Sequence, residues 1–141
     1  MEIQYSKSEQ ETLRIGEYIG RKLHPPRVIL LYGELGSGKT VLVRGLAQGL
    51  GVHDPDLVRS PSFTLVNQYA GKEGTIYHID FYRLEGPRDF FSIGLEEILA
   101  SHSIVIIEWA EKLLLEPENP LRIRIHNNAD PDTRRLEIED G

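Results

Sequence analysis

A glycine-rich loop with a lysine and a threonine at its end is the part of this chain best suited to chemistry. It consists of Gly33, Glu34, Leu35, Gly36, Ser37, Gly38, Lys39 and Thr40, which matches G-x-x-x-x-G-K-[ST] with one extra glycine. Glycines let the backbone approach phosphate oxygens closely, and successive N–H groups before a helix form an anion site. The lysine of such a loop reaches the β- and γ-phosphates, and the threonine hydroxyl joins the Mg²⁺ shell. We therefore expect a nucleoside triphosphate to bind here, over residues 33–41, the last of which is Val41.

The flanking sequence indicates how this loop is held. Residues 28–32 are an apolar run that predicts a buried strand, and the residues after Thr40 predict a helix. The alternative interpretation is a chance glycine turn that caps a helix. However, the motif specifies four positions, and a chain of this length rarely matches all four by chance. The apolar positions with helical spacing are Leu42, Val43, Leu46, Ala47 and Leu50.

Glu108 is the first of two carboxylates that could complete the site. It follows residues 104–107, four β-branched apolar residues typical of a strand that is buried on both faces. In open α/β sheets the carboxyl ends of such strands face the ligand crevice. An acid that only ends the strand in solvent is the alternative.

Asp80 is the second carboxylate, and it lies in an apolar and aromatic strand. Alternation places His78, Asp80 and Tyr82 on one face of that strand. A carboxylate among aromatic side chains is costly unless it is paired or bound to a metal. The alternative is an exposed face of a hairpin. Asp80 and Glu108 are therefore candidates for binding Mg²⁺ or positioning the nucleophile, and Lys39 is the third candidate catalytic residue.

Two further features have two interpretations each. Residues 60–64 supply three hydroxyls, from Ser60, Ser62 and Thr64, either as a switch that senses the γ-phosphate or as an ordinary turn. Trp109 is either part of the core or an aromatic surface near the nucleotide.

The remaining pattern predicts one α/β domain over residues 1–141, a P-loop NTPase-like three-layer sandwich with parallel central strands and added antiparallel strands. We expect Ser6 and Glu9 to form a capping box for a helix that ends before Pro25. The other expected elements are a strand at 3–5, a hairpin of strands 63–69 and 75–83, helices near 95–99 and 110–115, and strands at 121–126 and 134–139.

Composition narrows the class of protein. The chain has 141 residues, no cysteine, and 22 acidic against 16 basic residues, which gives a net charge of −6. Disulfides, thiolate zinc sites and cysteine nucleophiles are excluded. An acidic chain binds nucleic acid poorly by itself, so we expect any contact with nucleic acid to run through a partner. No apolar run approaches the roughly 18–20 residues of a membrane span, and the N-terminus lacks a signal-peptide layout, so we expect a cytoplasmic protein with no membrane contact.

Motifs of other nucleotide-binding classes do not occur. The Asn-Lys-x-Asp motif that reads guanine is missing, and the chain is too short for a transporter ATPase or a hexameric ATPase with its lid domain. A small P-loop kinase that transfers the γ-phosphate to a small molecule remains an alternative, as does a binding module with negligible turnover.

Four ordered segments resemble the TsaE (YjeE) family of small bacterial ATPases. These are the loop at 33–40, residues 60–69, residues 77–84, and the pair Glu108 and Trp109. The resemblance runs from about residue 6 to residue 115, and Ser62 stands where many members carry threonine.

The resemblance implies an ATPase that acts with TsaD and TsaB to modify tRNA. That machinery attaches a threonylcarbamoyl group to the adenosine just 3′ of the anticodon, and the transfer itself belongs to TsaD. It also implies that Lys39 holds phosphate, that Thr40 and Glu108 bind Mg²⁺, and that Asp80 supports the metal or the attacking water. ATP as the nucleotide rests on this resemblance.

Overall fold

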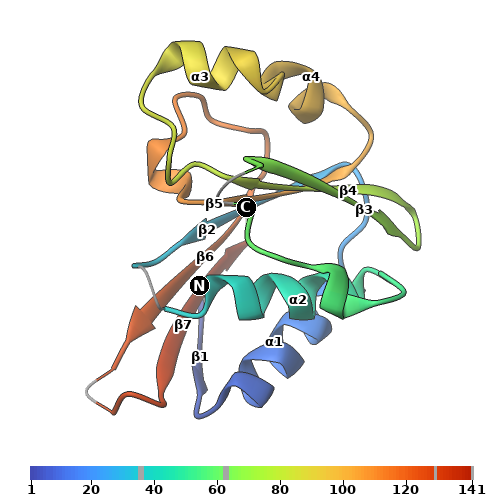
Figure 1. The fold of residues 1–141 in the computed structure, drawn as a ribbon. Helices are drawn as coiled ribbons and strands as arrows, with labels where there is room; N and C mark the ends of the chain where they lie inside the picture. The colour runs from blue at the N-terminus through green and yellow to red at the C-terminus, as the bar shows by residue number, and fades with distance from the viewer. Residues whose placement is uncertain (35–36, 62–63, 129, 141) are drawn as a thin grey trace.

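One sheet runs through the middle of the molecule, with strands in the order β1-β7-β6-β2-β5-β4-β3 (Figure 1). The computed structural model describes residues 1–34, 37–61, 64–128 and 130–140. The central pairs β2–β5, β2–β6 and β4–β5 are parallel, whereas β1–β7, β6–β7 and β3–β4 are antiparallel. The strands are β1 Glu2–Ser6, β2 Arg27–Tyr32, β3 Val66–Gly71, β4 Gly74–Asp80, β5 Ile104–Glu108, β6 Leu121–Asn127 and β7 Arg134–Asp140.

Helices cover both faces of this sheet, so the structure has three layers (Figure 1). Helices α1 (Glu9–Arg21) and α2 (Lys39–Gly49) lie on one face, and α3 (Pro87–Ser92) and α4 (Leu95–Ala100) lie on the other. Short 3₁₀ turns occur at Pro55–Leu57 and Ala110–Lys112. This arrangement confirms the predicted α/β sandwich with parallel central strands and antiparallel additions. Within the described ranges, no helix combines the length and apolarity needed to cross a bilayer.

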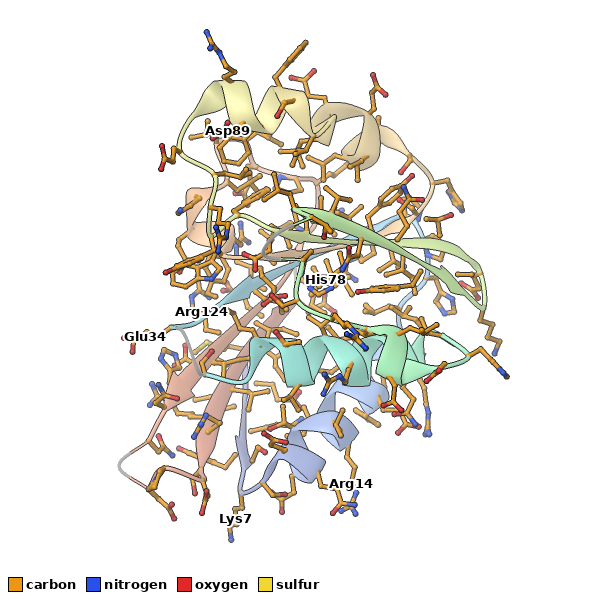
Figure 2. All side chains as sticks on the ribbon, viewed as in Figure 1. Lys7, Arg14, Glu34, His78, Asp89 and Arg124 are labelled. Carbon is orange, nitrogen blue, oxygen red and sulfur yellow. The ribbon has the colours of Figure 1, made fainter. Side chains whose placement is uncertain are left out.

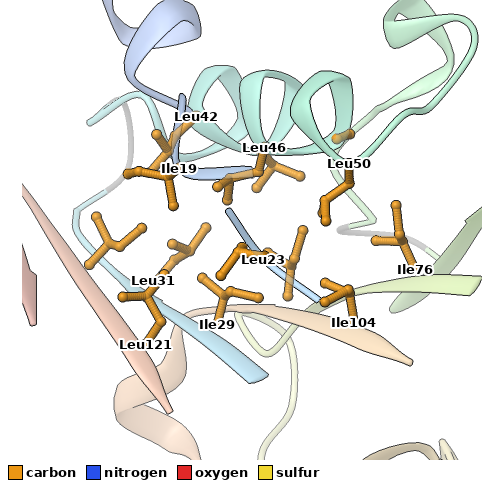
Figure 3. Packing of buried hydrophobic residues seen from close by; sticks show 14 of the residues in the cluster. Ile19, Leu23, Ile29, Leu31, Leu42, Leu46, Leu50, Ile76, Ile104 and Leu121 are labelled. Atoms are coloured by element: carbon orange, nitrogen blue, oxygen red, sulfur yellow. The ribbon is translucent and has the colours of Figure 1, made fainter. Parts of the chain in front are cut away.

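All of β5 and the four middle residues of β2 are buried, because successive residues pack alternately on one helical layer and the other. Ile29 and Leu31 of β2 belong to the core under α1 and α2, whereas Val28 and Leu30 pack toward α3 and α4. Figure 3 shows the first of these cores, with Leu46 of α2 above the sheet. Complete burial of such a side chain contributes about 1.5–3 kcal/mol. The strand that leads into the glycine-rich loop is therefore held rigidly.

Helices α1 and α2 approach each other through glycines. A Cβ added at Gly45 would lie 2.4 Å from the carbonyl oxygen of Leu13, and one at Gly49 would lie 2.3 Å from that of Glu17. Gly20 of α1 has the same relation to the carbonyl oxygen of Leu46, at 2.4 Å. Only glycine permits backbones this close, so these residues fix the position of α2 and of the loop before it.

The start of α1 differs from the predicted one. Ser8, and not Ser6, caps the helix: its hydroxyl accepts the N–H of Glu11, and the Glu11 carboxylate accepts the N–H of Lys7. Ser6 instead ends β1 and is buried, with its hydroxyl 2.6 Å from that of Thr12.

Three other predicted elements are shorter in the structure. Strand β4 stops at Asp80, where the carboxylate accepts the N–H of Tyr82 at 2.8 Å and turns the chain. Strand β3 begins only at Val66, because Leu65 has a positive φ of 70°. The helix expected at 110–115 is a single turn over Ala110–Lys112.

Candidate functional site

The last glycine of the loop, Gly38, has a φ of 99° and immediately precedes α2, which begins at Lys39. No described side chain caps this helix, so the N–H groups of its first turn are available to an anion. The N–H of Ser37 donates to the carbonyl of Glu34, and Arg134 of β7 donates to the carbonyl of Ser37, both at 3.1 Å. The buried hydroxyl of Ser37 has no partner in the described part of the chain. The predicted nucleotide-binding residues Leu35 and Gly36 lie outside the described residues.

Lys39, at the first position of α2, is buried with 6% exposure. Its ammonium group donates to the carbonyl oxygens of Gly33 and Glu34 and lies 4.2 Å above the centre of the Trp109 ring. Burial lowers the pKa of Lys39, and the surrounding carboxylates, Glu108 foremost, oppose this shift. The Lys39 ammonium therefore lies close to the loop carbonyls and to several acidic groups.

Asp80 and Glu108 lie side by side at the carboxyl edge of the sheet. They are register partners at the ends of β4 and β5, and Glu108 also pairs with Leu31, two residues before the loop. Their exposures are 4% and 3%, so neither carboxylate faces open solvent. Burial raises the pKa of Asp80; the N–H of Tyr82 opposes this shift, and the charge of Glu108 adds to it.

His78 is the functional candidate that sequence reasoning missed. It was predicted only to share a face with Asp80, but its fully buried ring lies against Glu108, with 2.5 Å between Nε2 and Oε2. Figure 2 labels it inside the molecule, whereas Glu34 lies at the outer edge. The alternation of β4 placed it on the correct face, but no local signal identified Glu108 as its neighbour. Tyr82, predicted for the same face, lies beyond the end of β4 and is 41% exposed.

The loop before β3 contacts one of these two carboxylates, Asp80. The Ser60 hydroxyl donates to Asp80 Oδ2 at 3.4 Å. The hydroxyl of Thr64, also predicted to be part of a switch, donates to the side chain of Asn67 at 2.7 Å instead. Ser62 and Phe63 lie outside the described residues.

Trp109 lies between the core and the glycine-rich loop. It follows β5 with a positive φ of 57° and packs at the edge of the core under α3 and α4. The ring also lies under the Lys39 ammonium and 5.1 Å from the ring of Tyr82. The only tryptophan of the chain is thus placed to report on a ligand at the loop.

Two cavities flank the loop. One of about 360 Å³ is lined by Tyr32, Glu34 and Trp109 among others. The other, of about 370 Å³, is lined by residues that include Gly38 and Val41. Space for groups attached to a bound phosphate thus exists next to the first residues of the loop and next to the start of α2.

The residues at this edge fit Mg²⁺ as part of a metal–nucleotide complex. The Thr40 hydroxyl and the carboxylates of Asp80 and Glu108 are oxygen ligands, which Mg²⁺ prefers, together with water and phosphate oxygens. Within the described ranges, no group of three or more acidic or histidine side chains is arranged to hold a metal by itself. This donor set suits a cation that arrives with phosphate and not a metal held by the protein alone.

The sequence matches a known family over almost its whole length. The family model described as "Threonylcarbamoyl adenosine biosynthesis protein TsaE" matches residues 6–136. That range contains the loop, both carboxylates, His78 and Trp109.

Curated relatives agree with the family match. A Treponema pallidum protein named tRNA threonylcarbamoyladenosine biosynthesis protein TsaE is 42% identical, over 89% of this chain and 91% of its own length. A relative of the same name from Nostoc is 39% identical, over 92% of this chain and 80% of its own length. Another, from Aquifex aeolicus, is 40% identical, over 85% of this chain and 92% of its own length.

A solved structure shares the fold. Bacillus subtilis YdiB superposes with a TM-score of 0.73 at 28% identity, over 96% of this chain and 82% of that one. With the family model matched from residue 6 to residue 136 and relatives above 30% identity, the chain belongs to the TsaE family.

Proposed function

We propose that this protein is the ATPase subunit required for threonylcarbamoyl modification of the adenosine 3′ of the anticodon in tRNAs, acting with TsaD and TsaB. Its family membership and the names of its relatives support the pathway. The observation that carries the ATPase activity is the meeting of Lys39, Asp80 and Glu108 where the P-loop, β4 and β5 end.

Each of these residues has a part in hydrolysis. The loop N–H groups and Lys39 hold the triphosphate and neutralise charge that develops on it. Thr40 and Glu108 hold Mg²⁺, which supplies further charge neutralisation when bound. Asp80, buried beside Glu108 with a raised pKa, orients the attacking water or supports the metal.

The proposal includes the setting in which the ATPase works. We assign residues 1–141 to one P-loop ATPase domain, which is supported by the single sheet that all the described strands share. The net charge of −6 supports contact with tRNA only through the partner proteins, because phosphate repels an acidic surface. A cytoplasmic location follows from the proposed work on tRNA.

A small-molecule kinase, the alternative from sequence, gains no support. None of the relatives reported above is named a kinase. The proposed water-activating role of Asp80 also requires no acceptor molecule.

Genetic replacement tests this function. In bacteria depleted of their own TsaE, expression of this chain should restore threonylcarbamoyladenosine in total tRNA, measured by mass spectrometry of nucleosides. The Lys39→Ala variant, expressed at the same level, should not restore it. Failure of the wild-type chain to restore the nucleoside, with TsaD and TsaB from the same source organism supplied, would contradict the proposal.

A further inference from the structure

His78 occupies an unusual place for a core residue. Its ring is 0% exposed, in a strand whose neighbour Ile79 is also fully buried. An apolar side chain would fill this position without the cost of burying two ring nitrogens. Both nitrogens have partners: Nε2 lies 2.5 Å from Glu108 Oε2, and Nδ1 lies 3.2 Å from the Tyr69 hydroxyl.

Two hydrogen bonds orient the His78 ring. A carboxylate accepts hydrogen bonds, so His78 Nε2 donates to Glu108. His78 Nδ1 is hydrogen-bonded to the Tyr69 hydroxyl at 3.2 Å. Such a pair of contacts fixes the plane of the ring, and thereby the direction of the hydrogen bond donated to Glu108.

Tyr69 extends the network to the loop before β3. Its hydroxyl lies 3.3 Å from both the backbone N and the backbone O of Arg59. Arg59 is followed by Ser60, whose hydroxyl donates to Asp80. The same short loop thus contacts Asp80 directly and reaches Glu108 through Tyr69 and His78.

We propose that His78 is a positioning residue that holds the Glu108 carboxylate in the orientation needed for Mg²⁺, and that Tyr69 ties this contact to the loop at Arg59 and Ser60. The inference rests on the proposed function, because it gives Glu108 the role of a metal ligand. Groups that orient metal ligands in this way change metal affinity or activity by about 10–100-fold when removed.

Two amides separate positioning from packing. In His78→Gln the amide nitrogen reaches the place of Nε2 and can still donate to Glu108, whereas in His78→Asn it reaches only the place of Nδ1. The two side chains are similarly polar and differ by one methylene. His102→Leu, a change at an exposed histidine just before β5, is the control for loss of a ring.

The readout is Mg²⁺ affinity, measured by titrating Mg²⁺ into the protein loaded with a non-hydrolysable ATP analogue. Fluorescence of Trp109, next to Lys39, reports the binding. We expect His78→Asn to weaken Mg²⁺ binding by about 10–100-fold and His78→Gln by less than about 3-fold. Affinity for the analogue without Mg²⁺ and the melting temperatures of the two variants should be similar. Tyr69→Phe should have a smaller effect in the same direction as Asn.

Equal Mg²⁺ affinity in the Gln and Asn variants, whether like wild type or equally weakened, would overturn the positioning role. ATP turnover of the wild-type protein with TsaD and TsaB, measured in parallel, distinguishes failure of the proposed ATPase function from failure of the proposed role of His78. Absent turnover in wild type counts against the proposed function, whereas the Gln-to-Asn difference decides the role of His78 in either case.

Discussion

Because glycines bring α1 and α2 into backbone contact, we expect a glycine-to-alanine change there to destabilise the protein, although helix propensity alone predicts stabilisation. Replacing glycine by alanine inside an exposed helix stabilises it by about 1 kcal/mol. In Gly45→Ala, however, the new Cβ would lie 2.4 Å from the carbonyl oxygen of Leu13 and 3.0 Å from the Cα of Gly16. Both neighbours are backbone atoms, so no side-chain rotation relieves the contact.

The loss of stability in Gly45→Ala can be estimated from how far α1 and α2 must move apart to make room for the new Cβ. A comfortable carbon–oxygen contact is about 3.3 Å or more, so the two helices must move apart by about 1 Å. A gap of that size forfeits up to about half of the dispersion energy at the interface, and overpacking costs about 1–3 kcal/mol. Taking the upper value and subtracting the propensity gain, we expect a loss of about 2 kcal/mol, or about 4–8 °C in melting temperature for a chain of this size.

Urea unfolding followed by circular dichroism measures this difference. Gln48→Ala, at an exposed position of the same helix, is the matched control and should change the free energy of unfolding by less than about 0.5 kcal/mol. A Gly45→Ala protein as stable as wild type, or more stable, would refute the reasoning that backbone contact fixes α2.

Three further predictions concern the site itself. Lys39→Ala should remain folded but lose about 10–150-fold in triphosphate affinity, measured by Trp109 fluorescence, since each charge-assisted hydrogen bond contributes about 1.5–3 kcal/mol; wild-type affinity would contradict the site assignment. Glu108→Ala and Asp80→Ala should each reduce kcat by about 10²-fold while changing nucleotide affinity far less, and normal turnover in either would remove that residue from the catalytic group. Asp80→Asn should raise the free energy of unfolding near neutral pH, because burial raises the pKa of Asp80 and the folded state resists its ionisation. This gain should vanish as pH falls below the ordinary value of 3.8, where the carboxyl is protonated in both states; a gain independent of pH in chemical denaturation would exclude this cause.

Local patterns were sufficient for the strand–loop–helix unit and for β5. The loop has its own motif, and the run at 104–107 is apolar enough to require burial on both faces, as the structure confirms. Glu108 was found because it ends a buried strand at the edge that faces ligands, and Asp80 because a carboxylate in an apolar strand is costly unless it is paired or bound to a metal. Their burial is confirmed, and their catalytic and metal roles stay predictions.

Features that depend on pairing between distant segments could not be predicted. His78 and Glu108 are thirty positions apart, and only the register of β4 on β5 brings them together. The helix cap shows how a local pattern fails: Ser6 and Ser8 each have an acid three residues later. The pairing of Ser6 with Arg134 of β7 keeps Ser6 in the sheet and leaves the cap to Ser8.

ATP turnover of the purified chain, with and without the TsaD–TsaB pair, tests the central claim most directly. The sequence shows no evident lid and no clear arginine finger, and the lack of an arginine finger is worth about 10³–10⁵-fold in rate in related sites. We expect slow phosphate release from the chain alone, a rise on titration with the pair, and tighter complex formation when ATP is present, since such coupling is reciprocal. Equal rates with and without the partners, together with a complex affinity indifferent to ATP, would contradict the account.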